Sequence, residues 1–102
     1  MGVFTLVAKI SDIIPGTCSL VEVNNDRILL SNINGKLHAI GELCPHADGP
    51  LSEGTLEGDQ IKCPWHASFF DVKTGKVTEG PSIESVPVYE VKIDGDDIFV
   101  KV

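Results

Sequence analysis

Long apolar runs are absent from this chain of 102 residues. No segment approaches the roughly 20 consecutive apolar residues that a membrane-spanning helix needs. Residues 1–6 lack the basic region and the apolar core of a secretory signal peptide. Leu6 also stands where a myristoylation motif requires Ser or Thr. We therefore expect no membrane attachment and a cytoplasmic location.

Basic residues are scarce. The chain has 8 Lys and Arg against 15 Asp and Glu, which gives a formal net charge of −7. Binding to nucleic acid needs clustered Lys and Arg that neutralise phosphates, and a surface of anionic lipid attracts proteins in the same way. The charge balance therefore argues against both kinds of partner.

Cysteine is also rare, and its number is odd. Three cysteines, Cys18, Cys44 and Cys63, do not make a framework of paired disulfides, which fits a reducing compartment. Cys18 lies apart from the other two in an apolar stretch, so we expect it to be a small buried side chain. The length fits one domain, and 42% apolar residues suffice for a core. We expect residues 1–102 to form a single monomeric domain.

No helical apolar pattern of ten or more residues is present, and short apolar runs alternate with turn signals instead. Asp12 is a candidate cap for a single turn in the connector 10–16, and residues 42–59 are too rich in Gly and Pro for long regular structure. Hairpin turns are expected at Asn24-Asn25, Asn34-Gly35 and Thr74-Gly75, and Gly80-Pro81-Ser82 is expected to form a turn. Strands are expected over 3–8, 18–23, 27–33, 36–41, 60–62, 69–72, 76–77, 86–93 and 98–102. Many short strands with polar turns predict an antiparallel sandwich or barrel.

Two short motifs follow expected strands: Cys44-Pro45-His46 and Cys63-Pro64-Trp65-His66. Each proline fixes its own φ and keeps the cysteine before it out of helical geometry. The motifs are therefore expected to form rigid loops at hairpin tips, each offering one thiolate and one imidazole. Four such ligands that face one point predict a metal site.

Zinc is the first metal to consider, because it is the commonest metal with Cys and His ligands. Structural zinc sites usually space their cysteines by two to four residues and their histidines by three to five. Here each motif mixes a Cys with a His, and 16 residues separate His46 from Cys63. Mixed pairs fit better with a binuclear iron cluster in which one iron takes both thiolates and the other takes both imidazoles. A zinc-held structural module stays as an alternative.

The words around the two motifs, residues 44–51 and 63–71, resemble the Rieske iron–sulfur family, and the likeness covers essentially the whole chain. Within that family the chain most resembles the small soluble ferredoxins of aromatic-ring dioxygenase systems. The resemblance implies a Rieske-type β sandwich or barrel with a cluster-binding subdomain of two loops, about residues 42–82. It also implies one [2Fe–2S] cluster per chain, with Cys44 and Cys63 on the inner iron and His46 and His66 on the outer iron.

Four further side chains are implied to surround the cluster: Trp65, Ser68, Phe70 and Pro81. The high-potential branch of the family carries a disulfide between its loops, where this chain has Gly49 and Trp65. Ser68 matches a serine that donates to a cluster sulfur, whereas Phe70 replaces a tyrosine that donates to a ligand sulfur. We therefore expect a potential in the lower part of the range of about −150 to +300 mV. Pro81 resembles a loop that covers the cluster, and Trp65 is either a shield or a core residue.

Only three histidines are present, and the cluster would take two. His38, on an expected strand, is predicted to be solvated, and one histidine is too few for the mononuclear iron of an oxygenase. The resemblance therefore implies an electron carrier and not an enzyme, which accepts electrons from a flavoprotein NAD(P)H reductase and passes them to a terminal oxygenase. The alternative is the Rieske-like small subunit of an assimilatory nitrite reductase. The acidic residues Asp48, Glu53, Glu57 and Asp59 are interpreted as a solvated loop in preference to a docking surface.

Overall fold

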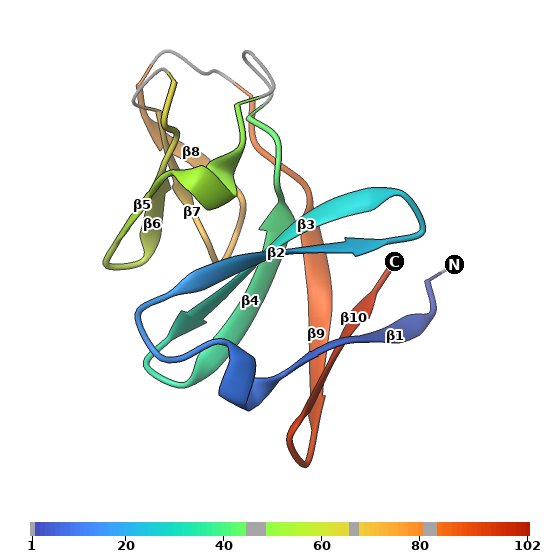
Figure 1. The fold of residues 1–102 in the computed structure, drawn as a ribbon. Helices are drawn as coiled ribbons and strands as arrows, with labels where there is room; N and C mark the ends of the chain where they lie inside the picture. The colour runs from blue at the N-terminus through green and yellow to red at the C-terminus, as the bar shows by residue number, and fades with distance from the viewer. Residues whose placement is uncertain (1, 45–48, 66–67, 81–83) are drawn as a thin grey trace.

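The computed structural model describes residues 2–44, 49–65, 68–80 and 84–102. Nearly all of its regular structure is β-strand, arranged in two antiparallel sheets (Figure 1). The expected all-β fold is confirmed. Within the described ranges, no helix is both long and apolar enough to cross a membrane.

The larger sheet has six strands in the order β1-β10-β9-β4-β3-β2. Its edge strands β1 and β2 also contact each other, so the sheet is a nearly closed barrel. A single 3-10 turn, η1 (Ile10–Asp12), joins those two strands. The six strands are β1 (Phe4–Lys9), β2 (Cys18–Val23), β3 (Asp26–Ile33), β4 (Lys36–Gly41), β9 (Val88–Asp94) and β10 (Asp97–Lys101).

The smaller sheet is inserted between β4 and β9 and has four strands in sequential order. Each of its strands has only three residues, and a second 3-10 turn, η2 (Leu51–Glu53), precedes the first of them. The strands are β5 (Thr55–Glu57), β6 (Gln60–Lys62), β7 (Phe69–Asp71) and β8 (Val77–Glu79). Where residues 42–59 are described, they form no long regular structure, as expected, but β5 is a strand that the sequence did not predict.

Asparagine and glycine make the tight turns of the barrel. Asn24 and Asn25 have φ of 50° and 72° and join β2 to β3, whereas Asn34 and Gly35 have φ of 54° and 93° and join β3 to β4. A two-residue type I′ turn requires positive φ at both positions, which Asn and Gly tolerate. Both expected hairpins are confirmed.

The last long strand starts two residues later than expected, at Val88. Val86 belongs instead to the connection between the sheets, where its N–H donates to the Gly75 carbonyl at 2.8 Å. The Pro87 carbonyl accepts from the N–H of Gly41 at 2.9 Å. The expected turn at Gly80-Pro81-Ser82 falls partly outside the described residues.

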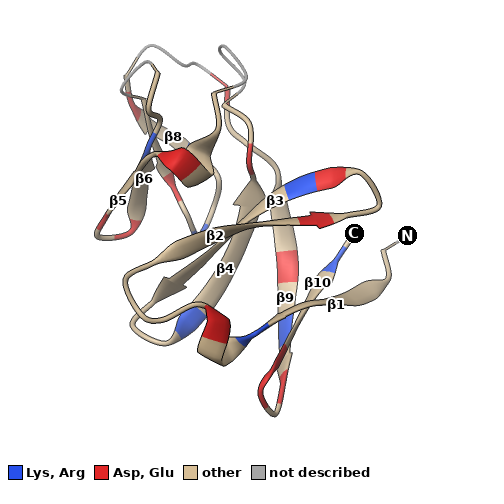
Figure 2. Ribbon diagram, in the orientation of Figure 1, with Lys and Arg blue, Asp and Glu red and all other residues tan. Residues whose placement is uncertain are grey.

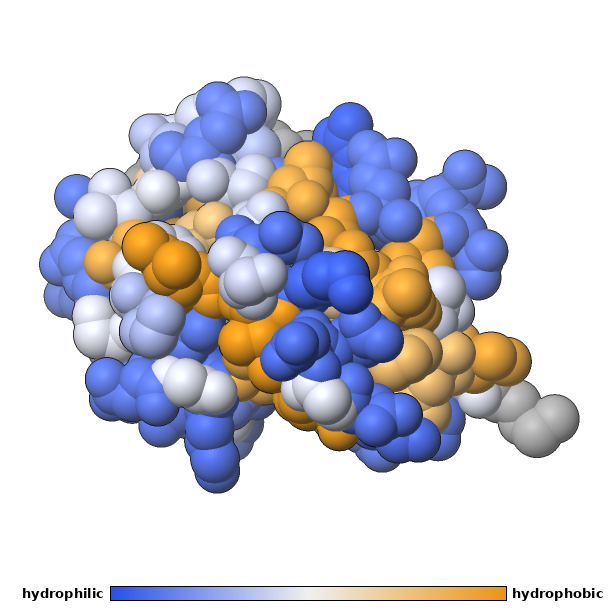
Figure 3. Space-filling view, turned by 60° about the horizontal axis from the view of Figure 1, so that its bottom comes forward, coloured by the Kyte–Doolittle hydropathy of each residue, from blue (hydrophilic) through white to orange (hydrophobic). Residues whose placement is uncertain are grey.

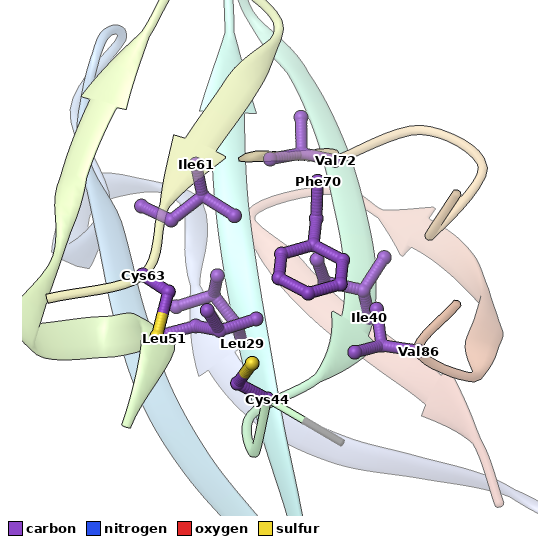
Figure 4. Close-up of a cluster of buried hydrophobic side chains, with 9 residues drawn as sticks. All are labelled: Leu29, Ile40, Cys44, Leu51, Ile61, Cys63, Phe70, Val72 and Val86. Carbon is purple, nitrogen blue, oxygen red and sulfur yellow. The ribbon is translucent and has the colours of Figure 1, made fainter. Parts of the chain in front are cut away.

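Two hydrophobic cores share strand β3, whose side chains alternate between them. The barrel core consists of Ile13, Val23, Ile28, Leu30, Leu37, Ala39, Ile98 and Val100. The second core lies between the barrel and the smaller sheet (Figure 4) and consists of Leu29, Ile40, Cys44, Leu51, Ile61, Cys63, Phe70, Val72 and Val86. Seen from the end away from the smaller sheet, the surface intersperses hydrophobic and hydrophilic groups (Figure 3). The second core contains Cys44 and Cys63, so it lies at the end of the molecule that carries both cysteine motifs.

Candidate metal centre

The first motif lies in a loop whose base is closed by backbone hydrogen bonds. The chain leaves β4, and residues 42–44 pair with residues 49–51 through a β-bridge between Leu43 and Pro50. The N–H of Cys44 donates to the Gly49 carbonyl at 2.9 Å. The Cys44 side chain is fully buried. The structure therefore fixes this cysteine at the base of its loop and turns it inward.

The second motif extends the β6–β7 hairpin beyond its last strand pair, in which Lys62 faces Phe69. The N–H of Cys63 donates to the Ser68 carbonyl at 2.7 Å, which continues the ladder by one step. Both Cys63 and Ser68 are buried. A cysteine at this position is thus held by a sheet, as the strand-then-loop pattern of the sequence predicts.

The two cysteine side chains converge in the second core. Figure 4 shows both sulfurs at the same end of that core, beside Leu29 and Leu51. Neither is joined by a disulfide, and their exposed fractions are 0% for Cys44 and 1% for Cys63. A buried pair of thiols without a disulfide, brought together by two loops 16 residues apart, fits a shared soft metal centre.

Gly49 is where one loop touches the other. A Cβ atom on Gly49 would lie 2.9 Å from Cys63 Sγ and 3.5 Å from the indole ring of Trp65. Real Cβ atoms essentially never approach another heavy atom that closely. The missing side chain therefore gives the sulfur of the second loop its space, and this position requires glycine for packing and not for an unusual φ.

The predicted neighbours of the centre have different surroundings. Phe70 is fully buried, and its ring lies between Ile40, Val86 and the cysteines (Figure 4). Trp65 is 59% exposed and is therefore not a core residue, and shielding of the cluster by Trp65 stays a prediction. His46, His66 and Pro81 lie outside the described residues, so the structure describes the thiol half of the predicted ligand set.

His38 differs from its predicted solvated state. It is half-buried on β4, and its Nε2 atom is buried without a hydrogen-bond partner among the described residues. Burial lowers the pKa of His38, and the positive charges of Lys73 and Lys36 lower it further, against smaller opposing effects of Asp59 and Asp71. The physical reason for the difference is tertiary, because the connections of the smaller sheet cover this face of β4.

Cys18 has the small, inward-facing role that its sequence context predicts, although it is half-buried and not fully buried. It packs against the edge of the second core. Burial raises the pKa of the Cys18 thiol, and the Glu42 carboxylate raises it further. A thiol of this kind stays protonated near neutral pH and is a poor nucleophile.

Glu42 is a residue that the sequence patterns do not single out. Its side chain is 1% exposed, and its carboxylate accepts hydrogen bonds from the N–H and the hydroxyl of Ser52. A lone acidic residue at a strand end is ordinarily solvated. The available signal is its place, because Glu42 lies two residues before Cys44 and Ser52 comes directly after residues 44–51, the stretch that resembles the family.

The model of the Rieske [2Fe–2S] domain matches residues 3–90 of this sequence. The chain belongs to the Rieske [2Fe–2S] family. Family membership accounts for the paired motifs, and the buried, disulfide-free thiols fit the cysteine half of its ligand set. The space at Gly49 fits it as well, because a second cysteine sulfur lies directly against the first loop.

Curated members of this family include proteins of very different length. The chain is 34% identical to apoptosis-inducing factor 3 of Homo sapiens over 93% of its own length, but it spans only 16% of that protein. It is 36% identical to the ferredoxin component of biphenyl 2,3-dioxygenase from Rhodococcus jostii, covering 94% of this chain and 90% of that one.

Solved structures of the family include free and complexed ferredoxins. The ferredoxin of carbazole 1,9a-dioxygenase from Nocardioides aromaticivorans superposes with a TM-score of 0.91 at 32% identity, covering 95% of each chain. A complex of reduced oxygenase and oxidised ferredoxin in carbazole 1,9a-dioxygenase contains a chain that matches with a TM-score of 0.89 at 33% identity, covering 95% and 91%. A nitrite reductase small subunit from Mycobacterium tuberculosis has a TM-score of 0.88, covering 100% and 96%, but its 22% identity shows the fold alone.

Proposed function

We propose that this protein is a one-electron carrier, a Rieske-type ferredoxin, that passes electrons from a flavoprotein NAD(P)H reductase to a terminal oxygenase. In this proposal Cys44 and Cys63 bind one iron of a single [2Fe–2S] cluster, and His46 and His66 bind the other. The convergence of two buried thiols at the contact between two Cys/His loops is the observation that carries it.

A bound [2Fe–2S] centre supplies the reversible uptake of one electron. The chain sets how readily that electron is accepted. Two thiolates and two neutral imidazoles leave the oxidised site uncharged, whereas four thiolates would make it doubly negative, and this difference favours a higher potential. The backbone of Gly49 and the apolar side chains of the second core keep water away from the sulfurs, which further tunes the potential.

The partners are inferred from the family and from the surface. Ferredoxin components of dioxygenase systems are among the relatives, and a related ferredoxin has been solved together with its oxygenase. Next to the second loop, exposed Trp65 borders a hollow of about 540 Å³ that Lys62, Cys63 and Pro64 help to line. Such an aromatic side chain beside a hollow suits contact with a protein partner. Acidic positions are frequent at η2 and around the β5–β6 turn (Figure 2).

The proposed carrier is a monomer that acts in the cytoplasm. Residues 1–102 form one domain, and residues 42–82 form its cluster-binding subdomain. The smaller sheet supports that division, because its four strands, together with Cys44 and Cys63, fall within residues 42–82. The protein transfers electrons and is not itself an enzyme.

The test is a measurement of iron and acid-labile sulfide per chain on the purified protein, with visible and EPR spectra before and after reduction. Two irons and two sulfides per chain and a coloured, EPR-active reduced state are expected. A colourless protein with one zinc would refute the proposal in favour of a structural module. Copurification with a sirohaem-containing large subunit would refute the oxygenase assignment in favour of a nitrite reductase.

A further inference from the structure

Glu42 is a buried acidic residue in an unusual position. It directly follows β4 and is 1% exposed, although acidic side chains are almost never fully buried unless they are paired. Among the described residues, no Lys or Arg forms an ion pair with it. A buried carboxylate needs donors for its oxygens, so its hydrogen bonds indicate what it does.

Both carboxylate oxygens are bound by a single residue on the far side of the first loop. The Ser52 N–H donates to Oε1 at 2.8 Å, and the Ser52 hydroxyl lies 2.5 Å from Oε2. The backbone joins the same two segments, because the Leu51 N–H donates to the Glu42 carbonyl at 2.8 Å. The N–H of Glu42 donates in turn to the Arg27 carbonyl of β3 at 3.1 Å. Glu42 therefore ties the start of η2 to the barrel.

We call the side-chain contact between Glu42 and Ser52 the clamp. The residues between its two ends, 43–51, contain Cys44. One further backbone link lies above the clamp in the same loop: the Cys44 N–H donates to the Gly49 carbonyl, and together with the Leu51–Glu42 hydrogen bond it makes up the Leu43–Pro50 bridge. Holding a flexible loop closed costs conformational entropy. The Glu42–Ser52 contact is the link that uses side chains, and its buried carboxylate makes it the strongest kind of hydrogen bond in the loop base.

The negative charge of Glu42 also reaches the core that contains the sulfurs. It acts on the thiol of Cys18, which packs against that core. A fixed negative charge inside a protein is weakly screened. It therefore opposes the addition of an electron to any centre held nearby.

We propose that Glu42 and Ser52 are positioning residues that hold the first loop closed on Cys44, and that the charge of Glu42 lowers the reduction potential of the bound centre. This inference rests on the proposed function. It separates into a geometric effect of the hydrogen bonds and an electrostatic effect of the charge, and different substitutions remove them one at a time.

Glu42→Gln keeps the shape and removes the charge. Its amide oxygen can accept from the Ser52 N–H, and its amide N–H can donate to the Ser52 hydroxyl, so the clamp is preserved. Glu42→Ala removes the charge and the clamp together, whereas Ser52→Ala removes only the hydroxyl. Glu57→Gln, at an exposed end of β5, removes one negative charge from the surface of the smaller sheet as a matched control.

All variants are purified as full chains alongside the wild type, and iron, sulfide, far-UV circular dichroism and midpoint potential are measured. Glu42→Gln is expected to retain the wild-type iron content with a raised potential. Glu42→Ala is expected to lose more than half of the iron, Ser52→Ala less than that, and Glu57→Gln none, with an unchanged potential. A higher iron content in Glu42→Gln than in Glu42→Ala would show that the hydrogen bonds to Ser52, and not the charge, hold the loop.

Full iron content in Glu42→Ala, or a potential in Glu42→Gln equal to that of the wild type, would overturn the corresponding half of the inference. Loss of the β-sheet spectrum in both Glu42 variants would overturn the positioning role, because the residue would then support the whole fold. A wild-type protein without iron and sulfide would sink the proposed function instead, so the two failures are distinguishable.

Discussion

Replacing Gly49 by Ala tests whether the contact between the two loops creates the metal site. The new methyl carbon would start 2.9 Å from Cys63 Sγ, whereas ordinary contacts begin at 3.4 Å, so the sulfur or the loop must move by about 0.5 Å. Gly49 is not among the glycines with positive φ. Alanine therefore meets no backbone strain, and only the steric contact is tested.

The expected cost follows from the packing. Overfilling a well-packed core costs about 1–3 kcal/mol, and Cys63 is 1% exposed and surrounded by the second core. If that cost falls on the sulfur position needed for ligation, the affinity for the metal centre falls by about 5- to 150-fold. The affinity for the metal centre should therefore fall more than the stability of the fold, because the displaced atom, Cys63 Sγ, is itself a predicted ligand.

The assay compares iron and sulfide per chain and the visible spectrum of Gly49→Ala with those of Gly58→Ala. Gly58 lies in the β5–β6 turn of the same sheet and has φ of +61°, and a methyl group at its Cβ position would meet no atom within 4 Å. Its substitution costs about 1 kcal/mol through backbone strain but should leave the iron content unchanged. A full complement of iron and sulfide in Gly49→Ala, with an unaltered spectrum, would refute the steric reasoning.

Substitutions at three other residues give independent tests. Phe70→Tyr places a hydroxyl where the ring faces the cysteines and should raise the midpoint potential; stabilising the reduced state by about 1.4 kcal/mol raises it by about 59 mV, and Phe70→Leu, which adds no donor, should not raise it. Ser68→Ala should lower the potential if the buried hydroxyl donates to a sulfur, and an unchanged potential in redox titration would contradict that role. The lowered pKa of His38 means that the unfolded chain binds more protons than the folded one below about pH 6.5. Urea unfolding should therefore show stability falling as the pH drops from 7 to 5, and His38→Gln should flatten that slope; equal slopes would exclude His38 as the cause.

The sequence predicts the turns of the barrel because their chemistry is local. Asn24-Asn25 and Asn34-Gly35 need only their own backbone preferences to form type I′ turns. The cysteines of the site are predictable for a similar reason, since the proline after each one excludes helix. Strand positions followed from short apolar runs, and the ends of the expected strands moved by no more than two residues. The exception is β5 (Thr55–Glu57), which lies in a stretch expected to be loop-like and exists because it pairs with β6.

Burial that depends on distant segments is harder to predict. The carboxylate of Glu42 finds its donors ten residues away, across a loop whose closure is itself tertiary. His38 loses its solvent because the smaller sheet packs over β4, and no pattern within 36–41 carries that information. Trp65 is the opposite case: the sequence left open whether it is a core residue, because it is large and apolar, and the structure places it at the surface in the second loop.

Strand β3 is buried on both faces, with Ile28 and Leu30 in the barrel core and Leu29 in the core that contains the cysteines. Because β3 contributes side chains to both cores, opening either core exposes one face of β3 and weakens the strand on which the other core depends. The barrel and the smaller sheet should therefore unfold as one cooperative unit, in which amide hydrogen exchange of β6 and β7 approaches the rate set by global unfolding. The two loops that contain Cys44 and Cys63 are attached to this unit, so the structure beneath them would not unfold separately each time a partner binds or leaves.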